Sequence, residues 1–304
     1  MTSENKIVLS ASRRTDIPAF YMPWFMAQIE KGRFTIVNPF NRRETIVPAT
    51  PDHVHSIVFW SKDFGAFLKK EFGQRLQERG YHLFFNFTIN SGNPLLEPNV
   101  PALPDRLAQL EDLCRRFTPE AINWRFDPIC YFRSGNDRIQ NNLQGFTRIA
   151  EKAAGLGITR CITSFMDDYA KIRKRIAIIP EFNFVDPPAA EKIAQMLNME
   201  AALADKKIRL YTCCEKELLN ALPDDSMVEQ SSCIPNDLLL KLHGGNISLK
   251  QDRGQRVSAG CGCRVSVDIG SYRQHPCYHN CLFCYANPRP GMPENDTNSV
   301  FKNA

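Results

Sequence analysis

The sequence predicts an α/β protein, a partial or closed (β/α) barrel of the TIM type with a loop-rich, cysteine-containing C-terminal elaboration. Along most of the 304 residues, short runs of β-branched and aromatic residues alternate with amphipathic stretches. Strand followed by helix, repeated, is typical of a parallel sheet covered by helices. Seven strand-like runs are present, enough for a closed or partial barrel.

Each element has its own signal in the sequence. The expected strands lie at 6–12, 56–61, 82–89, 121–127, 158–165, 208–213 and 264–270. The expected helices lie at 103–117, 138–154 and 188–206. The last helix starts at a double proline, which favours a helix start, and the second runs into Gly-Leu-Gly, which favours a stop. Two similar runs around a polar turn predict a β-hairpin insertion at 34–49.

The expected domain organisation is simple. We expect one barrel-like domain over 1–288, in which 214–263 forms a loop-rich, cysteine-bearing elaboration. Residues 289–304 are polar and proline-containing, with little to bury, which predicts a flexible tail.

Composition limits the class of protein. Hydrophobic residues make up 43% and charged residues 23%, as in globular proteins, and no apolar stretch approaches the roughly 20 residues of a spanning helix. The start of the chain lacks an export signal, so we expect a cytoplasmic protein without membrane contact. In a reducing compartment, eleven cysteines indicate metal or redox chemistry instead of disulfides. A net charge of +5 favours an anionic ligand but does not indicate DNA binding.

Polar residues follow the expected strands, where a parallel barrel places its active site. Tandem arginines and an Arg-x-Asp pair suit recognition of a carboxylate or phosphate. We therefore take as catalytic candidates Arg13, Arg14, Asp16, Arg125 and Asp127. The same rim would hold Ser61, Lys62, Asn86, Thr88, Ser164, Asp167, Asp168, Glu215 and Asp268, and we expect about half of the rim residues to have no direct chemical role, since structural Arg–Asp pairs are common there.

Three cysteines stand close together near the end of the chain. Cys277, Cys281 and Cys284 have the spacing C-x-x-x-C-x-x-C, with Phe283 just before the last. Thiolates so spaced can bind three corners of a 4Fe–4S cluster and leave one iron open. Two alternatives stay open. The trio could bind zinc with His279, His275 or another cysteine, or could be free thiols exposed to oxidation.

This spacing, with an aromatic residue beside the third cysteine, resembles the cluster motif of radical S-adenosylmethionine enzymes. "CYHNCLFCYAN" is particularly similar to the spore photoproduct lyase branch. In that superfamily the cysteine loop follows the first barrel strand, whereas here it follows the last, so the chain resembles a circularly permuted version. Through "ASRRTDIP", "FWSK", "WRFDP", "CCE" and "CLFCYA", the whole chain also resembles a bacterial family of unknown function.

The superfamily resemblance implies an enzyme that takes an electron from a reductant such as flavodoxin or ferredoxin. It would cleave S-adenosylmethionine to a 5′-deoxyadenosyl radical that attacks a substrate. Phe283 and Tyr285 would flank the adenine, and Asp268 would bind a ribose or amine group. A small molecule, a peptide or a nucleic acid is open as substrate. The rivals are a zinc-stabilised barrel that binds or hydrolyses an anionic ligand, and a non-catalytic iron–sulfur redox protein.

A second cysteine group lies upstream. Cys233, Cys261, Cys263 and one of the tandem pair Cys213 and Cys214 can form a four-thiolate set for a second iron–sulfur cluster or a structural zinc ion. We favour Cys213, which lies nearer its strand. The alternative is that Cys233 is a core residue and the tandem pair is incidental. The remaining cysteines, expected in the core, are Cys114, Cys130 and Cys161.

Overall fold

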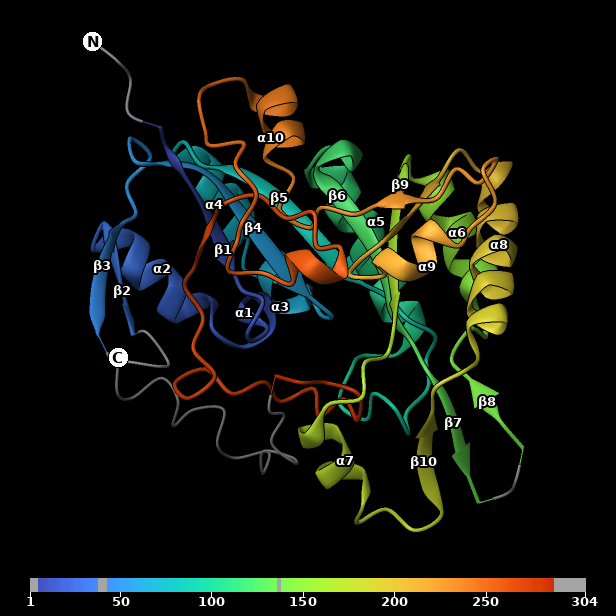
Figure 1. Cartoon of the computed structure of the whole chain (residues 1–304). Helices are drawn as coiled ribbons and strands as arrows, with labels where there is room; N and C mark the ends of the chain where they lie inside the picture. The colour runs from blue at the N-terminus through green and yellow to red at the C-terminus, as the bar shows by residue number, and fades with distance from the viewer. Residues whose placement is uncertain (1–4, 38–42, 136–137, 287–304) are drawn as a thin grey trace.

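A computed structural model describes residues 5–37, 43–135 and 138–286 (Figure 1). Its centre is a sheet of eight strands in the order β12-β11-β9-β6-β5-β4-β1-β13. The strands are β1 (Ile7–Ala11), β4 (Val54–Ser61), β5 (His82–Thr88), β6 (Ile122–Ile129), β9 (Arg160–Phe165), β11 (Arg209–Thr212), β12 (Glu229–Gln230) and β13 (Val267–Asp268). All seven predicted strands are confirmed, although β13 is shorter than expected. β12, with two residues, has no pattern that could have predicted it.

Neighbouring strands of this sheet pair in parallel. From β1 to β12 they follow one another in chain order, and β13 then returns to the other side of β1. Within the described residues the sheet does not close, because β12 and β13 are its edges. The prediction of a parallel α/β sheet is confirmed, whereas a closed barrel is not observed.

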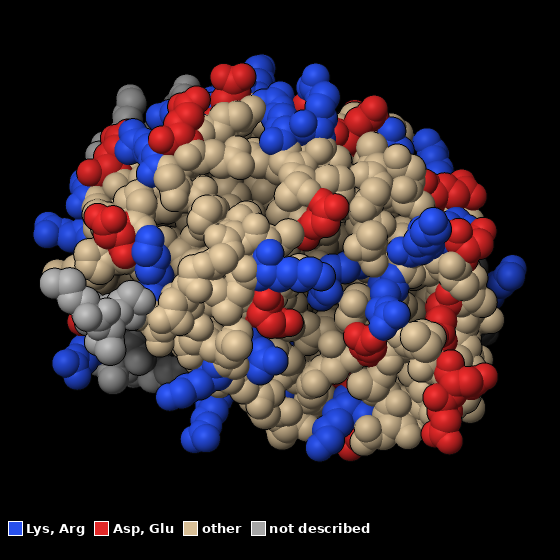
Figure 2. Space-filling view, turned by 90° about the horizontal axis from the view of Figure 1, so that it is seen from above, with Lys and Arg blue, Asp and Glu red and all other residues tan. Residues whose placement is uncertain are grey.

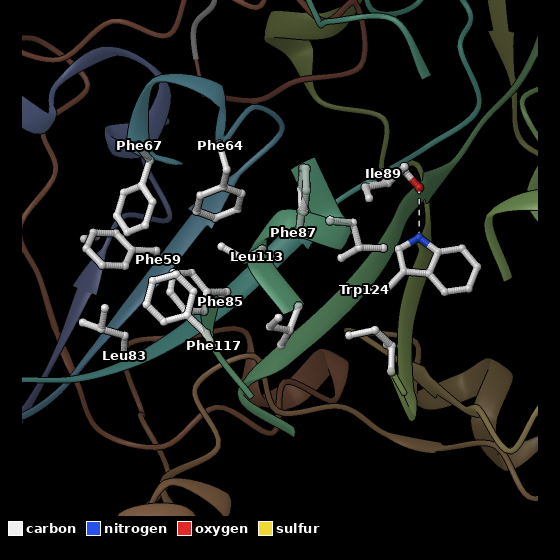
Figure 3. Packing of buried hydrophobic residues seen from close by; sticks show 14 of the residues in the cluster. Phe59, Phe64, Phe67, Leu83, Phe85, Phe87, Ile89, Leu113, Phe117 and Trp124 are labelled. Carbon is white, nitrogen blue, oxygen red and sulfur yellow. Dashed lines mark hydrogen bonds between the residues drawn. The ribbon is translucent and has the colours of Figure 1, made fainter. Parts of the chain in front are cut away.

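Alternation along the strands divides the core between two faces. On the outer face, Phe59, Phe85 and Phe87 meet Phe64, Phe67 and Phe117 in an aromatic cluster (Figure 3). The ring centroids of Phe64 and Phe87 are 4.9 Å apart, and those of Phe85 and Phe117 are 4.8 Å apart. Nearby, the buried Trp124 indole satisfies its N–H by donating to the Ile89 carbonyl at 3.0 Å. This packing fixes which strand residues face the other way.

Helices cover the outer face (Figure 1). They are α1 (Ile17–Phe20), α2 (Met22–Glu30), α3 (Gly65–Lys69), α4 (Phe72–Glu78), α5 (Leu103–Arg116), α6 (Phe146–Gly155) and α8 (Ala189–Ala204). Two further helices are α7 (Ala170–Ile176), which follows the carboxyl end of β9, and α9 (Lys216–Asn220), which packs beside α8 and β12. Prolines occupy the first turns of α1, α2 and α5, where a missing N–H is harmless. The predicted helices at 103–117 and 188–206 are confirmed. The one at 138–154 is wrong in its first half, where β8 (Gln140–Asn141) joins a second sheet instead.

Two smaller sheets extend the main one. The predicted hairpin is present as β2 (Arg33–Val37) paired antiparallel with β3 (Glu44–Pro48); its turn lies outside the described residues. A three-stranded antiparallel sheet of β10 (Phe182–Val185), β7 (Tyr131–Ser134) and β8 projects at the lower right of Figure 1. This sheet was not predicted, because its strands are short and β10 pairs with β7 across a long intervening segment.

The inner face of the sheet is covered by the cysteine-bearing elaboration. Side chains from four strands, Val8, Val58, Phe84 and Ile162, pack there against Ile234, Leu239 and Ile247. This segment contains α10 (Asn236–His243) and is otherwise mostly loop, as predicted for 214–263. The elaboration therefore fills the inner face that an open barrel would leave exposed. The expected flexible tail, 289–304, lies outside the described residues.

Charges of both signs are mixed on the surface in Figure 2, which views the molecule from above. On that face, no extended field of one sign accompanies the net charge of +5. None of the helices in the described part of the chain combines the length and apolar character that crossing a bilayer would demand.

Three histidines meet near the amino ends of β4 and β5. The rings of His82 and His243 stack at 4.3 Å, and His55 lies 5.5 Å from His82. Burial, together with the positive charge that His82 and His55 could carry, lowers the pKa of His243 to about 4. The pKa of His82 is also lowered, by burial and by His55 and Lys6. The folded protein therefore favours neutral rings here.

We expect His243→Leu to reduce the acid sensitivity of the fold. Because its folded pKa lies below the ordinary value of about 6.5, the stability due to neutral His243 is present above that pH and lost as pH falls toward 4. Between pH 7 and 4 the wild type should lose more folding stability than His243→Leu, by on the order of 1 kcal/mol. The value is small because solvent partly screens the half-buried ring. Thermal denaturation between pH 7 and 4 measures it. His53→Leu, at an exposed ring bonded to Thr50, is the control; equal acid sensitivity in both variants would contradict the prediction.

Candidate functional site

A cavity of about 290 Å³ opens at the carboxyl edge of the sheet. Both cysteine groups line it: Cys277, Cys281 and Cys284 from the loop after β13, and Cys213, Cys214, Cys233, Cys261 and Cys263 from the elaboration. Four predicted catalytic residues, Arg13, Asp16, Arg125 and Asp127, line the same cavity. Segments from both ends of the chain therefore meet at one site.

Successive side chains of a strand point to opposite faces of the sheet, and the polar side chains of β6 point into the cavity. Arg125 and Asp127 are two positions apart, so both lie on the inner face, where they form a salt bridge. Ser164 of β9 donates to the second carboxylate oxygen of Asp127 at 2.5 Å. Burial opposes ionisation of Asp127, but Arg125 and Ser164 outweigh it and lower the pKa. The other amino group of Arg125 donates to the sulfur of Cys233.

Two arginines lie over the indole ring of Trp60, an arrangement that no local sequence pattern predicts. The guanidinium carbon of Arg13 lies 5.8 Å, and that of Arg125 5.0 Å, from the indole centroid. Arg13 Nη2 is buried and has no hydrogen-bond partner among the described residues, because Asp252 is 3.9 Å away. Arg13 is therefore available to an anionic ligand in the cavity.

Asp16 fastens the late cysteine loop to the start of the chain. Its carboxylate accepts hydrogen bonds from Ala19 N–H at 3.0 Å, Ser61 Oγ at 2.7 Å and Lys62 N–H at 2.9 Å. His279, between the first two loop cysteines, lies with Nε2 2.7 Å from the same carboxylate. Asp16 is 5% exposed, and these four partners leave it little capacity for a substrate. Although it lines the cavity, its position is that of a structural anchor.

Aromatic residues of α1 and α2 hold the same loop. The Tyr21 hydroxyl donates to the Pro276 carbonyl at 2.6 Å. The ring of His275 lies 4.1 Å from that of Trp24, and the ring of Phe20 lies 4.8 Å from that of His279. These contacts fix the backbone on the amino-terminal side of the cysteines.

The three loop thiols are shielded from solvent. Cys277 is 8% and Cys281 2% exposed, and Cys284 is half-buried. Burial raises the pKa of all three thiols. The Ala286 N–H donates to the Cys284 sulfur at 3.3 Å, and the His279 N–H forms a backbone hydrogen bond to Cys277. Such donors stabilise a thiolate once its proton has left.

Cations surround the loop thiols. Lys62 acts electrostatically on all three, and its ammonium group lies 5.1 Å from the Phe283 ring. Lys62 is also held by Glu97 at 2.6 Å. Arg175 donates to the Leu282 carbonyl at 2.6 Å and is close enough to Cys281 and Cys284 to feel their charge. This environment suits a negatively charged group bound by the thiols.

Two predicted site residues lie outside the cavity lining. The Arg14 guanidinium donates to the Gly270 carbonyl at 2.9 Å. Asp268 accepts from the Ser10 and Ser12 hydroxyls and from the Arg13 and Gly270 N–H groups, so it holds β13 and its loop against β1. Both residues therefore have structural partners in the folded chain, and their contacts with a ligand stay predictions. Among the other expected cofactor residues, Phe283 and Tyr285 do line the cavity, and the Tyr285 hydroxyl donates to the Arg13 carbonyl at 3.2 Å.

The upstream cysteines gather at the carboxyl ends of β11 and β12, with both members of the tandem pair included. Asn86 Nδ2 donates to the Cys233 carbonyl at 2.9 Å and is itself held by Asn123, which in turn is bonded to Arg160. This polar chain crosses β5, β6 and β9 and fixes Cys233. Cys130 and Cys161 are fully buried in apolar clusters and Cys114 packs at the edge of one, as predicted.

Single-ion geometry is not present in the described part of the chain. No three or more His, Cys, Asp or Glu side chains are grouped there as ligands of one metal ion. Both ring nitrogens of His279 already have protein partners, Asp16 and the Asn99 carbonyl.

Fold and site together define a parallel α/β protein with a cysteine-lined cavity at the carboxyl edge of its sheet. The chain belongs to the family described as Domain of unknown function (DUF1848), which matches residues 8–286. Comparison with curated proteins and with solved structures gave no match. The predicted likeness to a bacterial family of unknown function is thus confirmed over nearly the whole chain.

We expect Asp16→Asn to loosen the cysteine loop. The amide keeps the shape but loses the charge and one acceptor oxygen, so folding stability should fall by about 2–3 kcal/mol. Chemical denaturation measures the loss, and limited proteolysis should cut 269–286 faster. Asp168→Asn is the control because its salt bridge with Arg173 is exposed, and its effect should stay within about 0.5 kcal/mol. Equal effects of the two changes would contradict the anchoring role.

We expect Gly262→Ala to displace the two cysteines that flank it. A Cβ at this position would lie 2.4 Å from the Ser231 carbonyl oxygen, and backbone atoms cannot give way as a flexible side chain would. Stability should fall by about 1–3 kcal/mol, and thiols of the reduced apoprotein should react faster with a thiol reagent. In the control Gly155→Ala, the new methyl group meets nothing within 4 Å. Unchanged stability and thiol reactivity in Gly262→Ala would refute the close approach.

Proposed function

We propose that the chain is an iron–sulfur enzyme that cleaves S-adenosylmethionine reductively and acts on an anionic substrate. The observation that carries this proposal is that Cys277, Cys281 and Cys284 line one cavity together with Arg13 and Arg125. The C-x-x-x-C-x-x-C spacing and its aromatic neighbour supply the resemblance to the radical enzymes.

The residues present fit a cluster with three protein ligands. Three sulfurs come from one loop that aromatic and carboxylate contacts hold in place, and Lys62 and Arg175 supply compensating charge. A four-iron cluster spreads its ligands over several iron atoms, so its thiolates need not converge on one point. Both ring nitrogens of His279 have protein partners, which disfavours His279 as a fourth ligand of zinc.

The strand order supports a relationship to a permuted barrel. β1 to β12 run in chain order and β13 returns beside β1, so the loop after β13 emerges at the carboxyl edge next to Arg13. A cluster loop that follows the first strand of an ordinary barrel would emerge at the same edge. We therefore infer a circularly permuted, incompletely closed relative of such barrels that works in a reducing compartment, the cytoplasm.

A bound cluster and S-adenosylmethionine would supply methionine and a 5′-deoxyadenosyl radical after transfer of one electron from flavodoxin or ferredoxin. The chain's own residues orient the partners of that reaction. Arg13, whose buried Nη2 has no hydrogen-bond partner among the described residues, would bind a carboxylate or phosphate of the substrate. Arg125 is already paired with Asp127 and Cys233, so it would hold the cavity wall in shape. Phe283 and Trp60 exclude water with apolar surface.

Anaerobic reconstitution tests the proposal. The wild-type chain should bind iron and acid-labile sulfide and should release 5′-deoxyadenosine from S-adenosylmethionine under reduction. Cys281→Ala should lose about four irons and essentially all of this cleavage, since one corner of the cluster lacks its ligand. Cys114→Ala, at a half-buried thiol on α5, should keep both.

Two outcomes would overturn the proposal. The first is a zinc-loaded, sulfide-free protein without cleavage, which would move the function to a zinc-stabilised barrel. The second is a cluster-loaded protein that never cleaves S-adenosylmethionine, which would indicate a redox protein. Circular dichroism of Cys281→Ala separates loss of cluster from loss of fold.

A further inference from the structure

Five thiols form a closed ring on the wall of the cavity. The Cys213 thiol neighbours those of Cys214 and Cys233, and the Cys263 thiol neighbours those of Cys233 and Cys261. The ring is completed between Cys214 and Cys261. The sulfurs of Cys213 and Cys214 lie 3.8 Å apart. Three chain segments therefore contribute to one sulfur cluster.

Local backbone features bring these sulfurs together. Cys213 and Cys214 are adjacent, and in extended backbone their side chains would point in opposite directions. Cys214 instead has a φ of 62°, in the left-handed region, a conformation that an ordinary L-residue adopts at a cost of about 1–2 kcal/mol. Gly262 lets Cys261 and Cys263 approach the Ser231 backbone more closely than any side chain would allow. An unfavourable backbone conformation at Cys214 and a close backbone approach at Gly262 therefore bring the thiols together.

Three guanidinium groups surround the ring. Arg125 donates to the sulfur of Cys233. The Arg13 guanidinium lies beside Cys263 and Asp268. Arg256, salt-bridged to Asp167, interacts electrostatically with Cys214. Asp127 and Asp167 already pair with Arg125 and Arg256, and the same guanidinium groups would also stabilise thiolates bound to iron.

We propose that the ring holds a second iron–sulfur cluster, ligated by Cys213, Cys233, Cys261 and Cys263, with Cys214 as a fifth thiol that is not a ligand. The chosen four include the three best-buried members of the ring, and Cys213 directly follows β11 beside Arg125.

The position of the ring adds a functional consequence. The loop thiols and the ring thiols line the same cavity, so a molecule bound there stands between two metal centres. A purely structural cluster would be sealed in the core, whereas this one borders the space where the substrate of the proposed reaction would bind. The assignment of the ring does not depend on S-adenosylmethionine chemistry at the loop.

Iron and sulfide analysis of the full chain tests the assignment. After anaerobic reconstitution, the wild type should hold about eight irons, and both Cys233→Ala and Cys281→Ala about four, with almost none in the double variant. Cys214→Ala should keep about eight. Mössbauer spectra of the two single variants should differ, because each reports a different cluster.

The outcomes for the two sites are separable. Wild-type iron in Cys233→Ala, or zinc without sulfide in Cys281→Ala, would overturn the second cluster and leave the proposed function standing. If Cys281→Ala keeps the iron content of the wild type while Cys233→Ala loses four irons, the proposed function would be overturned and the second cluster would stand. Loss of about four irons in Cys214→Ala would refute the ligand assignment. If Cys233→Ala fails to fold, native mass spectrometry of the wild type decides, since one cluster or two differ in mass.

Discussion

The site depends on the parallel pairing of β1 with β13. Asp268 makes this pairing specific, because its carboxylate accepts from two serine hydroxyls and two backbone N–H groups around β1 and the turn after β13. The pairing sets the direction in which the chain leaves the sheet, so the cysteine loop emerges beside Arg13. Asp16 then fastens the loop through His279. Together with the contacts of Phe20, Tyr21 and Trp24, these two carboxylates fix the loop cysteines relative to the cavity.

Alternation along the strands explains why one sheet carries both an apolar core and a reactive cavity. The outward positions of β4 and β5 are phenylalanines that pack under the helices. The inward positions of β4 to β6 include the apolar Val58 and Phe84 and, nearer the carboxyl end, Trp60, Arg125 and Asp127. Arg125 and Asp127 pair with each other, whereas Trp60 Nε1 and Arg13 Nη2 are buried without a hydrogen-bond partner among the described residues. For this reason we assign ligand binding to Arg13 before Arg125.

Local patterns made the strands and the loop cysteines predictable. Seven strands and two of three helices follow from short-range periodicity, and the spacing of Cys277, Cys281 and Cys284 lies within one loop. The five-thiol ring was only partly predictable, because its members come from separate segments and because the left-handed conformation of Cys214 has no sequence signal other than the tandem pair. Trp60 and Arg256 were missed since their roles arise from neighbours distant in sequence. The hydrogen bonds of Arg14 with the Gly270 carbonyl and of Asp268 with two serines could not be predicted, because they join residues that are distant in sequence.

The long reach of the β1–β13 pairing also sets an order of events in biosynthesis. Ser10 and Asp268 are separated by 258 residues, so the loop that carries Cys277 is fixed only after nearly all of the domain has left the ribosome. Contacts so distant in sequence form late in folding, because closing a long loop costs entropy before any contact compensates for it. Until then the loop cysteines are exposed to oxygen and to adventitious metals. A nascent chain of this family therefore has a vulnerable interval that slow translation or oxidative stress would lengthen.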